Sequence, residues 1–166
     1  LHESGVTLEP KPFSIGARIE HPQDLVDKAQ FGKFAGHARL GKADYKLVHH
    51  CSNGRTAYSF CMCPGGKIVP AAAYAENNIV NGMSLYHRDG EFANAAIVAG
   101  VNLELLLQKA VDAPEALDWV EALEHRFYEE MGSHDAPVMS IGEFIQGKAA
   151  TAPSQSSYPL GLRAAP

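Results

Sequence analysis

The first regular pattern along the chain is an alternation of apolar with polar or small residues over residues 13–20. A period of two places successive side chains on opposite faces, so this pattern predicts a half-buried strand. Residues 22–29 then predict a short helix, because a proline stands at an early position and the apolar residues that follow share one face. Residues 30–42 hold three glycines and several basic residues, which is typical of a loop.

Short apolar runs separated by turn-forming residues dominate the next part of the chain. The runs are residues 44–50, 56–63, 67–73 and 79–80, and the separators are Ser52-Asn53-Gly54, Pro64-Gly65-Gly66 and Glu76-Asn77-Asn78. Because Gly and Asn tolerate positive φ and Pro fixes φ, these separators predict turns in a meander of short antiparallel strands. Residues 95–101 are a further strand candidate, with helix as the alternative because Ala is a good helix former.

The last third of the chain has helical periodicity. Asp112 and Glu115 fit a capping box with a proline in the first turn. One apolar face follows at spacings of three and four, formed by Ala116, Val120, Leu123, Phe127 and Met131. Gly132 is suited to end this helix. Residues 140–146 predict a second, shorter helix.

These elements predict an α+β fold: mainly an antiparallel sheet or small barrel of short strands, followed by a C-terminal helical segment. We expect one domain over residues 1–147, strand-rich over 13–101 and helical over 103–147. Residues 148–166 are rich in Ala, Pro, Ser and Thr, which predicts a flexible linker or tail.

Composition narrows the class of protein. The 166 residues are 46% hydrophobic and 20% charged, which suits one globular domain. The net charge of −5 argues against nucleic acid or an anionic membrane as a partner, and no window is apolar enough for a transmembrane helix. An odd count of three cysteines favours a reducing cytoplasm over a disulfide scaffold. Because the chain begins at Leu1 and ends at Pro166, we expect a piece of a longer protein.

The cysteines are the first candidates for chemistry. His49, His50, Cys51, Cys61 and Cys63 are potential ligands of a soft metal, but the single residue between the last two is tighter than zinc sites normally use. Strand alternation offers a structural alternative, in which Cys61 and Cys63 lie on one face as small buried residues. Nothing in the sequence marks an activating cation, so a structural turn is favoured over a cysteine nucleophile.

Two polar segments are weaker candidates. Residues 36–43 nearly match a phosphate-binding loop, but Ala43 replaces the required hydroxyl. No buried strand precedes the segment and no helix pattern follows it, so we interpret the match as coincidence. Residues 81–94 are dense in polar side chains that either bind a ligand or cap the next element. No G-x-G-x-x-G occurs, so the chain has no dinucleotide-binding unit of its own.

Five strings together resemble the uncharacterised FAD-dependent dehydrogenases, bacterial flavoproteins with two dinucleotide-binding domains. They are Phe13-Ser-Ile-Gly-Ala-Arg-Ile-Glu-His-Pro-Gln23, Ala43-Asp-Tyr-Lys-Leu47, Tyr58-Ser-Phe-Cys-Met-Cys-Pro-Gly-Gly66, Val80-Asn-Gly-Met-Ser84 and Arg88-Asp-Gly-Glu-Phe-Ala-Asn94. The resemblance covers residues 13–158. It implies the middle, inserted domain of such a protein, which covers the flavin and shapes the substrate pocket but lacks both flavin-binding segments.

The resemblance also implies roles for particular residues. Cys61, Cys63, Gly65 and Gly66 would face the flavin, and a second set, Arg88, Asp89 and Asn94, would face substrate or the domain interface. FAD would belong to the parent, with NAD(P)H as a candidate donor. The fragment would hold no cofactor or metal, would be inactive alone, and would bind the flavin domain of its own parent or associate with itself. The alternative is a free-standing module that binds a metal or, through residues 81–94, a small ligand.

Overall fold

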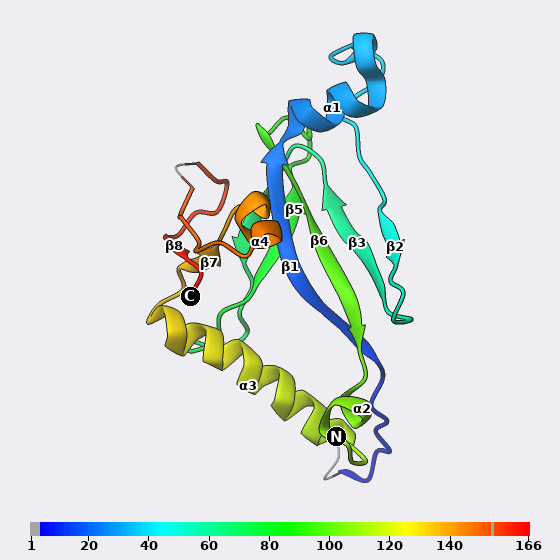
Figure 1. The fold of residues 1–166 in the computed structure, drawn as a ribbon, viewed down its shortest axis with the longest axis vertical. Coiled ribbons are helices and arrows are strands. Elements are labelled where there is room, and N and C mark those ends of the chain that lie inside the picture. The colour runs from blue at the N-terminus through cyan, green and yellow to red at the C-terminus, as the bar shows by residue number, and fades with distance from the viewer. Residues whose placement is uncertain (1–3, 154) are drawn as a thin grey trace.

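A four-stranded antiparallel sheet organises the chain in the computed structural model, which describes residues 4–153 and 155–166 (Figure 1). The strand order is β1-β6-β3-β2. These strands are β1 (Phe13–Pro22), β6 (Phe92–Val101), β3 (Thr56–Cys63) and β2 (Val48–His50). The fold is α+β, as predicted, and over the described residues the sheet stays open rather than closing into a barrel.

The pairing of β1 with β6 forms the spine of this sheet. The two strands are in register over ten residues each, from Phe13 opposite Val101 to Pro22 opposite Phe92. The alanine-rich segment is therefore strand, not the alternative helix, because Ala93 and Ala95 are fully buried in a central strand. Small side chains at these positions let neighbouring elements approach the strand closely.

A β-bulge interrupts the pairing of β3 with β6. The register shifts between Phe60 and Cys63, and Cys61 has a φ of 49°, in the left-handed region that non-glycine residues rarely adopt. The bulge breaks the two-residue alternation, so Cys61 is exposed while Cys63 is buried. The prediction that both cysteines share one buried face is therefore wrong.

The remaining strands form two smaller sheets of two strands each. The hairpin of β4 (Gly66–Pro70) and β5 (Val80–Ser84) is antiparallel. The short strands β7 (Ala136–Val138) and β8 (Leu162–Ala164) pair in parallel. A small apolar cluster joins the hairpin to these strands; its buried members are Ile68, Ala136 and Tyr158.

The helices are α1 (Gln23–Phe31), the 3₁₀ turn η2 (Gly32–Phe34), α2 (Leu103–Leu107), α3 (Ala113–Met131) and α4 (Ile141–Gln146). The predicted long helix is confirmed as α3, with the Asp112 side chain accepting from the Glu115 N–H at 2.8 Å. The full reciprocal capping box occurs instead at α4, between Ser140 and Glu143. Helix α2 lies in the segment expected to be helical, although no separate helix was predicted there; the Asn102 side chain caps it.

The C-terminal segment contacts the rest of the fold, although its composition predicted a linker or tail. Ser157 donates its backbone N–H to the Glu20 carboxylate at 3.1 Å, and its hydroxyl also bonds that carboxylate. The buried Tyr158 donates its hydroxyl to the His134 carbonyl at 2.7 Å. Residues 157 and 158 thus tie this segment to β1 and to the turn after α3.

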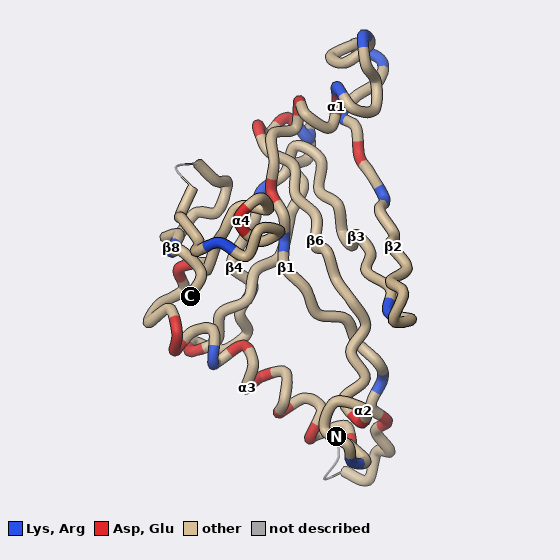
Figure 2. Tube along the Cα trace, in the orientation of Figure 1, with Lys and Arg blue, Asp and Glu red and all other residues tan. Residues whose placement is uncertain are grey.

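The interior is small and the exposed surface is large. The chain exposes 11447 Å², whereas a compact monomer of 17.9 kDa exposes about 8,000 Å². Helix α3 illustrates this, since Met131 is its one fully buried residue. Acidic residues also concentrate along α3 (Figure 2). No helix in the described residues is long and apolar enough to cross a membrane.

Candidate functional site

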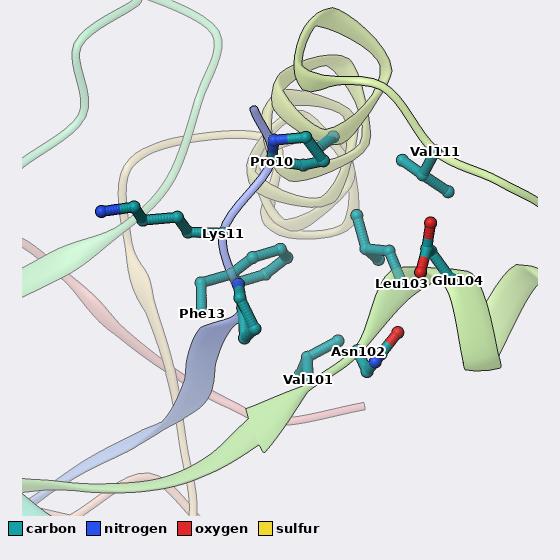
Figure 3. Close-up of a pocket in the computed structure, with 10 residues that line it drawn as sticks. Pro10, Lys11, Phe13, Val101, Asn102, Leu103, Glu104 and Val111 are labelled. Carbon is teal, nitrogen blue, oxygen red and sulfur yellow. The ribbon is translucent and has the colours of Figure 1, made fainter. Parts of the chain in front are cut away.

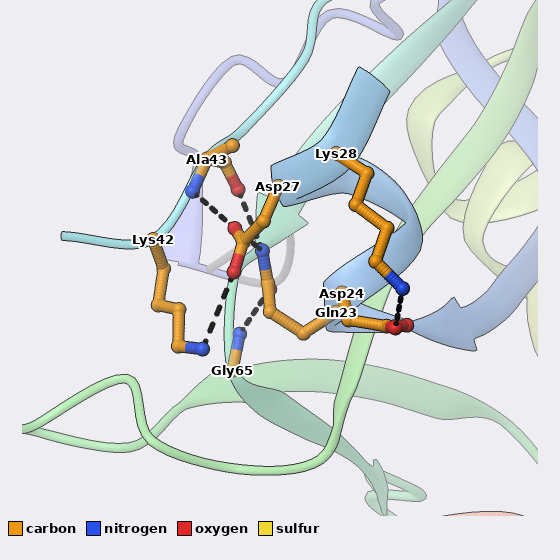
Figure 4. Close-up of polar contacts among 7 residues, drawn as sticks. All are labelled: Gln23, Asp24, Asp27, Lys28, Lys42, Ala43 and Gly65. Carbon is orange, nitrogen blue, oxygen red and sulfur yellow. Dashed lines mark hydrogen bonds and ion pairs between the residues drawn. The ribbon is translucent and has the colours of Figure 1, made fainter. Parts of the chain in front are cut away.

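A buried glutamine anchors the turn that carries the Cys-Met-Cys-Pro-Gly-Gly string. The Gln23 side chain, 1% exposed at the start of α1, accepts from the Gly65 N–H at 2.6 Å. Its amide nitrogen donates to Asp27 at 2.8 Å and to the Ala43 carbonyl at 3.0 Å (Figure 4). One side chain therefore connects α1, the segment before β2 and the glycine turn, and it satisfies polar groups that would otherwise be buried unpaired.

The Asp27 carboxylate completes this network. It accepts from the Ala43 N–H at 2.8 Å and pairs with the Lys42 ammonium at 3.3 Å. Burial raises the pKa of Asp27, but the hydrogen bonds from Ala43, Gln23 and Lys42 outweigh it and leave the pKa below its usual value. These contacts give residues 42 and 43 a structural role. The near match to a phosphate-binding loop follows a 3₁₀ turn and leads into coil, not the strand-to-helix setting that such a loop needs.

The glycines of the turn make room for this chain's own backbone. Gly65 has a φ of 52°, and a Cβ there would lie 1.8 Å from the Arg88 carbonyl oxygen. A Cβ on Gly66 would lie 2.4 Å from the Met83 carbonyl oxygen. The Gly90 N–H donates to the Gly65 carbonyl at 3.1 Å, which holds the two turns together. The close approach that the sequence suggested for a ligand is therefore taken by residues 83–90.

The two cysteines differ in environment. Cys63 is 4% exposed, and its thiol contacts the Cys61 carbonyl at 3.3 Å. Burial raises the pKa of the Cys63 thiol, and the electrostatic repulsion and hydrogen bond from Cys61 raise it further. Cys61 instead presents its side chain to solvent from the bulge. Of the four residues expected to face a flavin, only Cys61 is exposed.

The second set of candidate residues, Arg88, Asp89 and Asn94, also contains both exposed and buried members. Arg88 and Asp89 are exposed, and the contact that Arg88 makes with the turn is through its backbone. Asn94 is fully buried in β6, and its side-chain amide oxygen accepts a hydrogen bond from Arg18 at 2.8 Å. The structure therefore brings Asn94 close to Cys61 and leaves the Arg88 and Asp89 side chains on the surface.

Arg18 is the residue that joins Asn94 to Cys61, and the sequence did not single it out. Its Nη1 also donates to the Cys61 carbonyl at 3.2 Å, and its Nη2 donates to the Asn81 side chain at 3.1 Å. A Cβ on Gly82 would lie 2.3 Å from Arg18 Nη1, so that glycine makes room for the guanidinium. Residues from β1, β3, β5 and β6 thus meet around one cation. The alternation in β1 placed Arg18 on the polar face, but no sequence signal identified its partners.

The histidines do not join this site. His49 and His50 lie on β2, and the side chain of His50 bonds Thr56 at 2.9 Å. Within residues 4–153 and 155–166, no group of three or more His, Cys, Asp or Glu side chains is arranged to hold a metal ion.

The surface has two hollows, one beside the helices α2 and α3 and one along the strands β2 and β3. One of about 150 Å³ lies where the segment before β1 meets α2 and α3, with Phe13, Leu103 and Val111 among its walls (Figure 3). A larger, open one of about 580 Å³ lies along β2 and β3, between residues 44–48 and 56–62, and Cys61 is part of its wall. That volume falls in the range of small-molecule sites.

These residues do not fit a flavin held by this chain alone. A dinucleotide needs a glycine-rich turn between a strand and a helix, with free backbone N–H groups for its phosphates. Here the Gly65 N–H is bonded to Gln23, and the space beside Gly65 and Gly66 is filled by backbone. We therefore assign no flavin chemistry to these residues. The Cys61 side chain is exposed at the edge of this turn.

Comparison with known proteins relates this chain to FAD-dependent proteins. Residues 12–166 match the family described as FAD-dependent protein, C-terminal domain-like. An uncharacterised protein of Clostridium beijerinckii is 37% identical over 158 residues, which cover 91% of this chain. The chain spans 28% of the length of that relative. The chain therefore belongs to the C-terminal domain-like family of FAD-dependent proteins.

Proposed function

We propose that this chain is the inserted, substrate-side domain of a FAD-dependent oxidoreductase. It contacts the flavin-binding domain of its own parent chain and forms walls of the substrate pocket, and it is flavin-free and inactive alone. NAD(P)H is a candidate electron donor, and the reduced cysteines suit the cytoplasm. The membership of the family supports a parent that uses FAD.

The observation that carries this proposal is the size of the uncovered surface. The chain exposes about 3,400 Å² more than a compact monomer of its mass would. A stable protein–protein contact covers about 800 Å² on each partner, so the excess is large enough for an extensive domain interface. A relative more than three times as long supplies the chain length for such a partner.

The exposed apolar side chains supply candidates for that interface. Helix α4 exposes Phe144 at 73% and Ile145 at 75%, and α3 exposes Leu117 at 58% and Phe127 at 45%. Apolar side chains this exposed are typical of a surface that another domain covers. The isolated chain is expected to associate with itself through the same residues.

The visible absorption spectrum of the parent protein tests the proposal. A bound-flavin spectrum in the full-length parent, absent from this chain alone, is expected. Parent variants with aspartate in place of Phe144 or Ile145 should lose flavin or domain contact, whereas the same change at the exposed polar Gln155 should not. A colourless parent, or a flavin bound tightly by this chain alone, would refute the proposal.

A further inference from the structure

We propose that Arg18 forms a binding site for an oxygen anion, either a carboxylate or a phosphate. The site lies where β1, β3, β5 and β6 meet, and it opens toward the exposed residues Cys61 and Asn81. The proposal goes beyond the function proposed above and does not depend on it, since it rests on side chains of this chain.

Among the residues that the structure describes, the guanidinium has no negative partner. Its three hydrogen bonds go to neutral oxygens, namely the Cys61 carbonyl and the side-chain carbonyls of Asn81 and Asn94. No carboxylate in the described ranges lies within 4.0 Å of it. Glu20, on the same face of β1, uses its carboxylate to bind Ser157 instead. A half-buried cation without a counter-charge attracts an anion more strongly than one in open solvent does.

Hydrogen-bond donors also exceed acceptors at this position. An arginine side chain has five N–H donors, and three of those of Arg18 are used, so two lack a protein acceptor among the described residues. The side-chain amide nitrogen of Asn94 is buried and also lacks a hydrogen-bond partner within residues 4–153 and 155–166. A ligand that accepts hydrogen bonds and carries negative charge would pair with the two open guanidinium donors, and a planar guanidinium edge suits the two oxygens of a carboxylate or phosphate.

The surrounding backbone is organised to hold Arg18 in place. Cys61 adopts a φ of 49°, a strained conformation for a non-glycine residue, and its carbonyl accepts from Arg18 there. The absence of a side chain at Gly82 leaves the space that the guanidinium and Asn94 occupy. An arginine fixed on several strands before a ligand arrives loses little entropy on binding, which favours recognition.

Titration of this chain with pyrophosphate and, separately, acetate tests the site at constant ionic strength. Binding is followed by the amide NMR signals of Gly82 and Asn94. We expect saturable binding of one of these anions, weakened at least tenfold in R18Q and less in R18K. The exposed Arg126 on α3 provides the matched control, because R126Q removes the same charge elsewhere. Preference for pyrophosphate would identify the natural group as a phosphate, and preference for acetate would identify a carboxylate.

A second variant protects the test against misfolding of R18Q. N81D places a carboxylate within reach of Arg18 Nη2, 3.1 Å from the present amide oxygen, and supplies the missing counter-charge while keeping the arginine. We expect N81D to fold normally and to lose anion binding. If wild type binds neither anion with a dissociation constant below about 1 mM, or if N81D and R18Q bind as tightly as wild type, the proposal is wrong.

Discussion

Replacing Gly65 with alanine is the most direct test of how the glycine turn is built. The new Cβ would lie 1.8 Å from the Arg88 carbonyl oxygen and 2.2 Å from its carbon, whereas ordinary contacts begin near 3.4 Å. Both groups belong to backbone, so neither can move aside as a flexible side chain would. The turn must shift, and the hydrogen bonds from Gly65 to Gln23 and from Gly90 to Gly65 must lengthen or break.

The expected cost follows from those two bonds and from the backbone conformation. Leaving a buried polar group unpaired costs about 1–3 kcal/mol, and two are at risk. An alanine in the left-handed region adds about 1 kcal/mol. Gly147, with a φ of 60° and open space around it, provides a control that has the conformational cost alone. G65A should therefore lower the free energy of unfolding by about 2–6 kcal/mol more than G147A does.

Urea unfolding of this chain, followed by far-UV circular dichroism, measures both variants. The midpoint and the slope m are compared, since a change in midpoint at constant m reports stability. If G65A is no less stable than G147A, the backbone contact between the two turns is not tight and the interpretation of Gly65 as a packing residue fails. If G65A does not fold while G147A does, the difference exceeds the free energy of unfolding that G147A retains.

Three further predictions concern the same region. The variant Gln23→Met keeps the volume of the side chain but leaves the Gly65 N–H unpaired, so denaturant unfolding should show a loss of about 2–4 kcal/mol. Alkylation at neutral pH, mapped by fragmentation mass spectrometry, should label Cys61 well before Cys63, because Cys63 is buried and its thiol pKa is raised. The pKa of Asp27 in the folded chain lies below its usual 3.8. The stability that the ionised carboxylate contributes is therefore present at pH values above the unfolded pKa and is lost as the pH falls through the folded pKa. Asp27→Asn should flatten the acid limb of a curve of stability against pH.

The sequence predicted those parts of the fold that depend on local periodicity. The alternation over residues 13–20 is found in β1, and the apolar spacing after Asp112 is found in α3. Turn chemistry also located the breaks between the short strands. These features are predictable because hydrophobic period and capping act within a few residues of the chain.

Local periodicity and capping signals do not predict contacts between segments that are distant in the sequence. Arg18 meets partners 43, 63 and 76 residues away, and no local pattern encodes such a meeting. The bulge at Cys61 likewise reflects how β3 fits against β6, so alternation alone placed the two cysteines on one face incorrectly. The glycines of the turn were recognised as sites of close approach, but the sequence could not show that the approaching group is the backbone of Arg88.

The different positions of the two cysteines change how their role in a flavoprotein should be tested. Serine in place of Cys63 puts a hydroxyl at a buried position beside the turn that Gln23 anchors. Burying that hydroxyl disturbs the local packing, so a loss of flavin affinity in C63S would not by itself show contact with the flavin. Serine in place of the exposed Cys61 leaves its backbone carbonyl, and therefore the bond from Arg18, in place. In the full-length parent, C61S thus changes only the thiol. Altered flavin affinity or turnover in C61S would support contact between this bulge and the flavin, whereas unchanged values in C61S would contradict it even if C63S is impaired.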